Sequence, residues 1–563
     1  MRKVYLPLRF VWMVAAAVVA LSSAPSVRAQ GGEPPYFAIR GAKIVPVSGP
    51  VIENGTVILS RGIISAVGKD LKINDEAWII DGKGLTVYPG LIDSVSDVGI
   101  VAAAANPTEG TPRPTASAAR GPEDRPNTTP WRNAADEVNL GDKRIETWRN
   151  GGFTTVIAAP KSGFFPGTAA ILNLAGERAG DLVVKTPTAI PVNLRPAGGF
   201  GSGYPDSLMG VLAYVGQVWL DVDWSTRASA VYDKNPRVER PHYDRTAAAL
   251  AAALQRHAPV LIPSNSTMEI RRSMDLAERW KATAVLYGGQ MAYEIPREIA
   301  ARKLPVLVNA KWPEAEKDAD PEDKPSLRIL RFRDRAPSSA AALLKAGVKF
   351  AFYSGGITAP KDVLKAVKKS IEAGLPADAA LRALTLSPAE IFGVSDRLGS
   401  IETGKIANLT VTDGDLFEEK TKIRMVFIDG RKFDAHEPET PKDPPKGDIS
   451  GKWKLSFSTP DGAEEATADL SMEKDGTLLG TVTGKRGTGT ILSGYASADK
   501  FNFTINIPVD GNPTDITFSG TFDATSLKGT LSLSGFSTDF TGTKPGGGRA
   551  RASDAAAATG GAQ

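Results

Sequence analysis

Two separate segments of the chain carry short β-branched runs that are broken by glycine. Residues 36–88 include Gly55-Thr56-Val57-Ile58-Leu59, and residues 399–435 show the same pattern in Met425-Val426-Phe427-Ile428. Runs of this kind predict antiparallel strands joined by tight turns. Because the two segments flank a long middle region, we expect them to form one small composite β-sandwich built from both ends of a single unit.

The middle region, residues 89–398, alternates strand-like apolar runs with helix-like stretches. Helical patterns are expected over 268–280 and 361–373, and the strand-like runs lie at 154–159, 260–262, 283–287, 306–308 and 348–352. Strands that alternate with helices indicate parallel βα units, and roughly 300 residues of them fit a (β/α)8 TIM-like barrel. The stretch 102–130 is rich in Ala, Pro, Thr and Arg and predicts a long loop at the barrel mouth.

A third pattern begins after a proline-rich stretch at residues 437–448, which we interpret as a stiff linker. Residues 449–544 alternate strictly between apolar and polar positions, for example in 501–507 and 516–522. Turn signals recur roughly every 10 residues, which favours a separate C-terminal β-barrel or sandwich. The Gly-, Ala- and Ser-rich residues 545–563 predict a disordered tail.

The N-terminal residues 1–29 have the form of a secretory signal peptide. Basic residues precede an apolar run at 10–21, and Val27-Arg28-Ala29 provides a small-residue cleavage site before Gln30. The apolar run is shorter than the ~20 residues that a membrane-spanning helix needs. We therefore expect cleavage after Ala29, a periplasmic or secreted protein and no stable membrane span.

Cleavage also changes what the charge implies. The signal segment carries four basic residues and no acidic ones, so the mature chain has 63 Lys and Arg against 63 Asp and Glu. The basic excess of the full sequence therefore gives no support for a nucleic-acid partner. The chain has no cysteine, which excludes disulfides and thiolate chemistry.

Several motifs resemble the amidohydrolase superfamily, most closely its imidazolonepropionase-like branch. They are Asp81-Gly82-Lys83-Gly84-Leu85-Thr86-Val87-Tyr88-Pro89-Gly90-Leu91-Ile92-Asp93, the segment 379–393 with Leu384-Thr385-Leu386-Ser387-Pro388-Ala389, and the segment 396–409. The resemblance covers roughly residues 36–435. It implies a barrel enzyme that hydrolyses cyclic amides and other C–N bonds with one or two divalent metals bound at the carboxyl ends of the strands.

The metal ligands that this resemblance implies are missing from the sequence. The positions of the first histidine pair, of the two later histidines and of the catalytic aspartate are occupied by Val95, Asp97, Pro263, Gly288 and Gly355. Only Asp97 has a side chain that could bind a metal. We therefore predict a degenerate member with no metal cofactor, and zinc or a similar divalent ion only if a divergent activity persists.

Other residues offer little catalytic chemistry but do suggest a pocket. The chain has only three histidines, at His242, His257 and His436. Their spacing argues against a shared cluster, and we expect them at the surface or at helix starts. Lys161, Lys185 and Lys311 could act as bases if buried, and Ser354 lacks a histidine partner. Polar and aromatic residues at the expected barrel mouth suit a small neutral ligand, or else fill the vacated space: Asn265, Tyr287, Gln290, Tyr353 and Ser354.

Three functional hypotheses follow. The first is an exported amidohydrolase-family protein that has lost metal-dependent hydrolysis and acts as a binding protein or pseudoenzyme subunit. Such a protein could form a homo-oligomer or a hetero-oligomer with an intact amidohydrolase. The second is an active divergent hydrolase of C–N bonds in a cyclic amide or related small molecule. The third places the function in the C-terminal β domain, as a carbohydrate- or envelope-binding module.

Overall fold

The computed structural model describes residues 36–100, 125–195, 205–315, 324–435 and 443–544, the last without 460–461, 474–475, 486, 510–511, 524 and 534–535. The predicted signal peptide, most of the predicted loop 102–130, the start of the linker, His436 and the tail lie outside these residues. The chain divides into two compact units, Met1–Ala435 and His436–Gln563, and each is described by itself.

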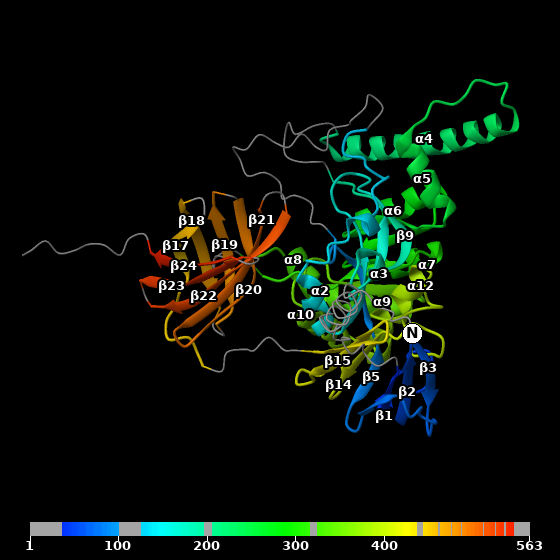
Figure 1. The fold of residues 1–563 in the computed structure, drawn as a ribbon. Helices are drawn as coiled ribbons and strands as arrows, with labels where there is room; N and C mark the ends of the chain where they lie inside the picture. The colour runs from blue at the N-terminus through cyan, green and yellow to red at the C-terminus, as the bar shows by residue number, and fades with distance from the viewer. Residues whose placement is uncertain are drawn as a thin grey trace, which may run out of the picture. The chain divides into compact units, whose positions relative to one another are not determined.

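The first unit contains a sheet made from both ends of the unit (Figure 1). β5 pairs with β1 in parallel and with β14 in antiparallel orientation, so the two sequence segments share one continuous sheet. Its core includes Phe37, Val57, Leu409 and Phe427, which are buried. All eight strands are linked into one sheet: β1 (Tyr36–Ile44), β2 (Ile52–Ser60), β3 (Ile63–Gly68), β4 (Trp78–Asp81), β5 (Thr86–Pro89), β14 (Leu409–Thr412), β15 (Ile423–Ile428) and β16 (Arg431–Asp434).

A second eight-stranded sheet forms a nearly closed barrel, in the order β6 to β13. Its strands are β6 (Leu91–Ser96), β7 (Phe153–Ala158), β8 (Ala169–Asn173), β9 (Val183–Pro191), β10 (Val260–Ser264), β11 (Ala284–Gly288), β12 (Val306–Asn309) and β13 (Phe350–Tyr353). Neighbouring strands are parallel except that β8 runs antiparallel to both β7 and β9. The predicted regular alternation therefore fails at β8, because residues 159–168 are too few for the crossover of a dozen or more residues that a parallel strand needs.

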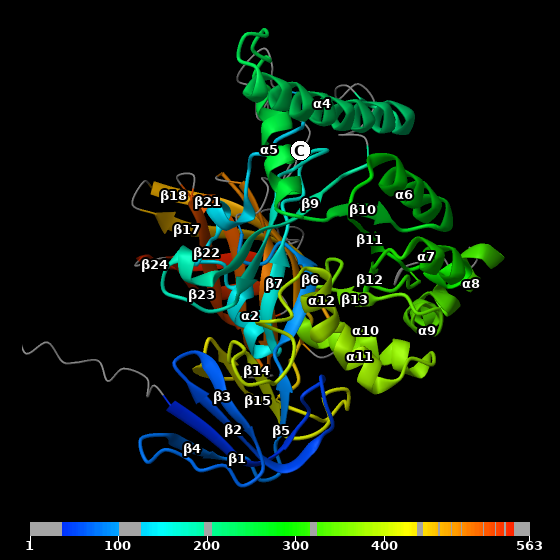
Figure 2. The same cartoon turned by 90° about the vertical axis from the view of Figure 1, so that its right-hand side faces the viewer.

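Helices cover the outer side of the barrel strands β10 to β13 (Figure 2). The helices predicted over 268–280 and 361–373 are present as α6 and α10. In α6 the apolar residues Ile270, Met274 and Ala277 recur on one face and are buried. The helices of this unit are α2 (Arg144–Asn150), α3 (Ala179–Leu182), α4 (Leu208–Lys234), α5 (Arg245–Gln255), α6 (Thr267–Trp280), α7 (Pro296–Arg302), α8 (Leu327–Arg335), α9 (Ser339–Lys345), α10 (Pro360–Glu372), α11 (Ala377–Ala383) and α12 (Leu386–Ile391).

The two edge strands of this barrel, β6 and β13, are joined through a buried side chain. The Asp93 carboxylate on β6 accepts hydrogen bonds from the backbone N–H of Ser354 at 2.9 Å and from the Ser354 hydroxyl at 2.8 Å. Asp93 is 1% exposed. Loss of hydration raises the pKa of Asp93 to about 6, although the hydrogen bonds from Ser354 act in the opposite direction.

The second unit is a closed antiparallel barrel of eight strands, which settles the choice between barrel and sandwich that the sequence left open. Its interior is filled by aromatic side chains, and the ring of Phe503 stacks on those of Phe501 and Phe518 with centroids 5.8 and 4.9 Å apart. The strands are β17 (Gly451–Thr459), β18 (Gly462–Met472), β19 (Leu478–Gly484), β20 (Gly487–Ser497), β21 (Lys500–Val509), β22 (Asn512–Phe522), β23 (Ser526–Leu533) and β24 (Phe536–Thr543). None of the helices described in either unit is long and apolar enough to cross a membrane.

Candidate functional site

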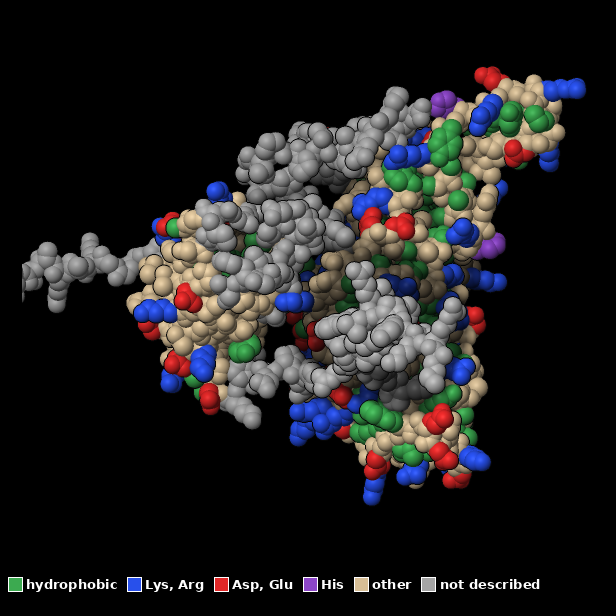
Figure 3. Space-filling view, in the orientation of Figure 1, with side chains coloured by type: hydrophobic (Ala, Val, Ile, Leu, Met, Phe, Trp, Pro, Cys, Tyr) green, Lys and Arg blue, Asp and Glu red, His purple; other side chains and the backbone are tan. Residues whose placement is uncertain are grey.

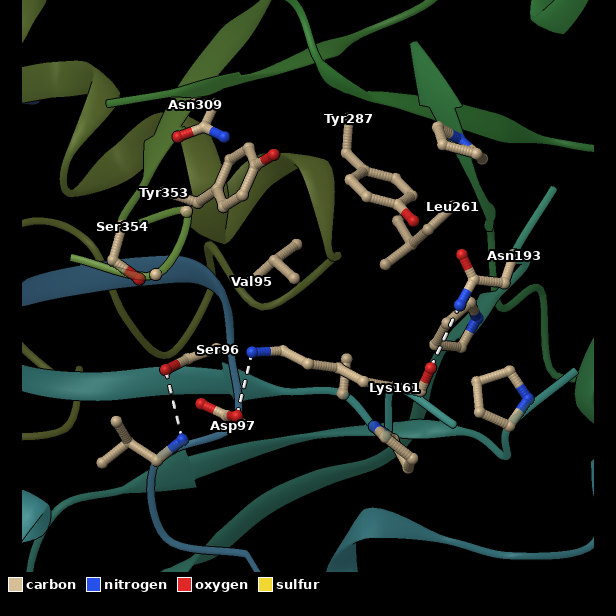
Figure 4. A pocket seen from close by; sticks show the side chains of 18 of the residues that line it. Val95, Ser96, Asp97, Lys161, Asn193, Leu261, Tyr287, Asn309, Tyr353 and Ser354 are labelled. Atoms are coloured by element: carbon tan, nitrogen blue, oxygen red, sulfur yellow. Dashed lines mark hydrogen bonds and ion pairs between the residues drawn. The ribbon is translucent and has the colours of Figure 1, made fainter. Parts of the chain in front are cut away.

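A pocket of about 580 Å³ opens where the parallel strands of the first barrel end (Figure 4). Its lining comes from the carboxyl ends of β6, β7, β9, β10, β11, β12 and β13 and from the segments that follow them. Parallel strands present their carboxyl ends at one edge, so side chains that are far apart in sequence converge there. This is the position at which the sequence predicts a site.

Most of the predicted site residues line this pocket. They are Val95, Asp97, Pro263, Asn265, Tyr287, Tyr353, Ser354 and Gly355. Gly288 and Gln290 are not among the lining residues. The Gln290 amide nitrogen instead donates to the backbone oxygen of Asn309 at 3.2 Å and to that of Lys311, so this side chain holds the segment after β12 and does not face a ligand.

Asp97, the candidate metal ligand, is held between two cations. Its Oδ1 lies 3.1 Å from Nη1 of Arg144, and its Oδ2 lies 2.9 Å from Nζ of Lys161. Burial of the carboxylate acts to raise its pKa, but the hydrogen bond and positive charge of Lys161, together with the charge of Arg144, lower the pKa below its ordinary value. Asp97 is therefore an ionised carboxylate whose charge is already matched within the protein.

The charges of the pocket are unevenly balanced. Among the described residues, three cations, Arg144, Lys161 and Arg195, line it, against the single carboxylate of Asp97. Arg144 has a second acidic partner in Asp142, at 2.8 Å, whereas no carboxylate of a described residue pairs with Arg195. The pocket as a whole is therefore electropositive, which favours an anion over the neutral ligand expected from the sequence.

Two tyrosines form the opposite wall. In Figure 4, Lys161 points toward Asp97, and Tyr287 and Tyr353 lie next to each other across the pocket. Their rings meet edge to face with centroids 6.4 Å apart. Burial raises the pKa of Tyr287 to about 12 and raises that of Tyr353 as well. Both phenols therefore remain protonated at neutral pH. The Tyr287 hydroxyl donates to the backbone oxygen of Val192 at 3.5 Å, and a ligand oxygen that lies closer could accept this hydrogen bond instead.

The residues at the remaining metal positions do not fit a metal. A Cβ at Gly288, whose φ is +120°, would lie 2.7 Å from Asn265 Oδ1. A Cβ at Gly355, whose φ is +61°, would lie 1.8 Å from Asn309 Oδ1. Side-chain amides thus occupy the space that a histidine or aspartate would need. No group of three or more His, Cys, Asp or Glu side chains suited to a metal ion occurs in the part of the chain that is described.

The other candidate bases lie elsewhere or are already paired. Lys185 is near the start of β9, and its Nζ donates to the backbone oxygen of Phe392 at 2.8 Å. Lys311 is exposed and does not line the pocket. His257 precedes β10 and is exposed, as predicted, and His242 lies in the segment between α4 and α5.

Several polar residues of the pocket were not predicted from the sequence. Asn193, Arg195 and Asn309 end or follow β9 and β12, and their position after apolar strand runs was a usable signal. Arg144 begins α2 and reaches Asp97 from 47 residues away. Nothing in the local sequence around Arg144 indicates that contact.

Comparison with known proteins supports the amidohydrolase superfamily for the first unit. The profile of the amidohydrolase family matches residues 331–433. Amidohydrolase tasK of Hapsidospora irregularis is 24% identical over 430 residues, which cover 67% of this chain and 39% of that protein. The chain thus spans well under half the length of this curated relative.

A solved structure supports the same fold. An amidohydrolase from Thermotoga maritima MSB8 aligns with 71% of this chain and 100% of its own at 24% identity and a TM-score of 0.58. A Xaa-Pro dipeptidase with bound methionine aligns with 71% of this chain and 100% of its own at 18% identity and a TM-score of 0.45. The first likeness establishes the fold, and the second is too distant to bear on the site.

Proposed function

We propose that the first unit is an amidohydrolase-superfamily barrel that binds a small carboxylate-bearing molecule and no longer carries out metal-dependent hydrolysis. The observation that carries this proposal is the lining of the pocket, where three cations face one carboxylate. The family's chemistry uses a metal to lower the pKa of water from 15.7 to about 7. The donors left at the family's metal positions are too few to hold such an ion.

The cations and phenols together suit a carboxylate. Lys161 and Arg195 supply charged donors, Arg195 in a planar fork that matches two carboxylate oxygens. Tyr287 and Tyr353 add protonated phenols on the facing wall. A cavity of about 580 Å³ is within the range of small-molecule sites.

Thermal unfolding with matched ligands tests the binding proposal. Succinate and glutarate should stabilise the first unit, and the uncharged analogues succinamide and glutaramide should not, since a ligand stabilises only the state that it binds. The stabilisation should disappear in the Lys161→Gln and Arg195→Gln double variant. Lys365→Gln, which removes an exposed cation on α10, is the control. Equal effects of the acids and the diamides would overturn the proposal.

Metal analysis tests the other half of the proposal. We expect purified protein, with or without added zinc, to hold no stoichiometric metal. Stoichiometric zinc that is lost on Asp97→Ala would instead favour the divergent hydrolase. In that case hydrolysis of cyclic amides should be measured next.

The finer assignments are proposals with their own support. Placement in the imidazolonepropionase-like branch is supported by the motifs between residues 379 and 409. Export is supported by the signal-like residues 1–29, and mass spectrometry of the secreted protein should find Gln30 at its N-terminus. Pairing with an intact amidohydrolase would appear as co-purification of a histidine-bearing homologue from the native source.

A further inference from the structure

Helix α4, the longest helix described, is apolar on two opposite faces. One face carries Val211, Val215, Val218 and Val222, which are buried against the rest of the unit. Trp219 belongs to the same face, and its ring stacks on that of Trp280 with centroids 4.8 Å apart. This face needs no further partner.

The opposite face of α4 is apolar and exposed. Met209 is 82% exposed, Leu220 63%, Trp224 58% and Val231 57%. Ala213, Gly216 and the exposed Arg227 complete a mainly apolar stripe that repeats every three or four residues, which places these residues on one side of the helix. Figure 1 shows α4 projecting from the barrel, and Figure 3 shows hydrophobic side chains among charged ones along it.

The buried contacts of α4 in the described structure do not extend to this stripe. On one flank Asp221 pairs with Arg125 at 2.6 Å, and this contact leaves the stripe uncovered. An amphipathic surface helix normally turns its polar face outward, whereas α4 exposes a mainly apolar face. Contiguous exposed apolar surface of this kind marks an interaction site.

The stripe is complementary to itself when a second copy is laid antiparallel about Leu220. In an antiparallel pair, residues at equal distances before and after the central residue face each other. Met209 would face Val231. Ala213 would face Arg227 and Gly216 would face Trp224, so that a small residue meets a large one in both of these pairs.

We propose that the protein forms a two-fold symmetric dimer through antiparallel pairing of α4 with α4 of a second copy, with Leu220 on the axis. A two-fold interface uses the same surface on both subunits, and antiparallel pairing of two identical helices meets that requirement. The 27 residues of α4 give a helix of about 40 Å. Gly216, around which a Cβ would meet nothing within 4 Å, provides the space that Trp224 of the second copy fills.

Light scattering of the chromatographed protein tests the dimer. The natural protein should be a dimer at micromolar concentration, and Leu220→Asp should dissociate it by at least about tenfold, because two carboxylates would meet on the axis. Met268→Asp is the matched control, since Met268 is 71% exposed on α6 and lies outside the stripe. Circular dichroism shows whether each variant is folded. A monomeric natural protein, or a dimer that survives Leu220→Asp, would overturn the proposal.

A charge exchange tests the antiparallel register. Ala213→Arg places two guanidinium groups opposite each other and should weaken the dimer, and adding Arg227→Glu should restore it. Failure of the second change to restore what the first one weakened would reject this register.

Cross-linking gives an independent measurement, because the chain has no cysteine of its own. Leu220→Cys should form a disulfide between two copies under mild oxidation. Met209→Cys alone should not, whereas Met209→Cys combined with Val231→Cys should. If the stripe instead binds vesicles of phosphatidylcholine and phosphatidylglycerol while the protein stays monomeric, the partner is a lipid surface and the dimer is excluded.

Discussion

The chain contains two eight-stranded barrels, and the first and last strands of each barrel are joined in different ways. The C-terminal barrel is closed by backbone pairing all the way round and filled with aromatic side chains. The first barrel is joined between β6 and β13 by the Asp93 carboxylate, and its mouth holds a charged pocket. A barrel that is filled and fully hydrogen-bonded gains stability, whereas one with polar groups at its mouth retains a place for a ligand.

The largest expected effect is on the filled barrel. Phe503→Ala removes a ring that is fully buried between two others and should destabilise the second unit by about 3–5 kcal/mol. The first unit should unfold as before in calorimetry. Tyr495→Ala, at a 39% exposed position of the same barrel, should change stability by less than about 0.5 kcal/mol. Equal losses would mean that the core is not closely packed.

The join between β6 and β13 should make the first unit sensitive to pH. Because the folded-state pKa of Asp93 is about 6, above its ordinary value, the folded state binds the proton more tightly. Stability should therefore fall as pH rises from about 4 to about 6, by an amount on the order of 3 kcal/mol. Asp93→Asn should remove this dependence and stabilise the unit at neutral pH, as measured by denaturant unfolding at several pH values.

Asp97→Asn is the matched control for that experiment. The pKa of Asp97 is lowered in the folded state. Asp97 therefore stabilises the first unit above the ordinary pKa of an aspartate, and this stabilisation is lost as pH falls through the folded-state pKa. Because the side chain is 34% exposed, the change should be no more than about 1 kcal/mol. Asp97→Asn should keep the fall in stability with rising pH that Asp93 causes, and Asp93→Asn should not show this fall. If the stability of both variants changed with pH in the same direction, the assignment of the pH dependence to Asp93 would be wrong.

A smaller effect distinguishes crowding from backbone strain at the pocket. Gly355→Ala forces a Cβ into Asn309 and also leaves alanine at positive φ, whereas Gly356→Ala, at φ +92°, meets nothing within 4 Å. Positive φ alone costs on the order of 1–3 kcal/mol. Gly355→Ala should therefore destabilise the unit more than Gly356→Ala, and Asn309→Ala should reduce the difference.

The smallest expected effect is on ligand affinity. Asp97→Asn removes the only carboxylate among the described residues that line the pocket, so succinate should bind about threefold more tightly, and the gain should shrink as salt screens the charges. Isothermal titration measures both quantities. Weaker binding would show that Asp97 positions Lys161 for the ligand.

Local pattern was enough to predict the strands of both end segments, the helices α6 and α10 and the strand-rich C-terminal unit. Periods of two and of about 3.6 residues arise from the backbone itself and can be found without the tertiary fold. The prediction of parallel strands failed at β8, because the pattern of apolar residues in a strand is the same whether the strand runs parallel or antiparallel to its neighbours. Local pattern also did not distinguish a β-barrel from a β-sandwich for residues 449–544, since apolar and polar residues alternate along the strands in both folds.

The sequence by itself determined that the positions where the resemblance predicts metal ligands include Val95, Pro263, Gly288 and Gly355, whose side chains contain no donor. The tertiary structure decided which side chains surround these positions. Asp97 meets Arg144 and Lys161 from 47 and 64 residues away, and Asn309 fills the space beside Gly355. The charge of a pocket depends on which distant side chains converge at the strand ends, and only the folded chain brings them together.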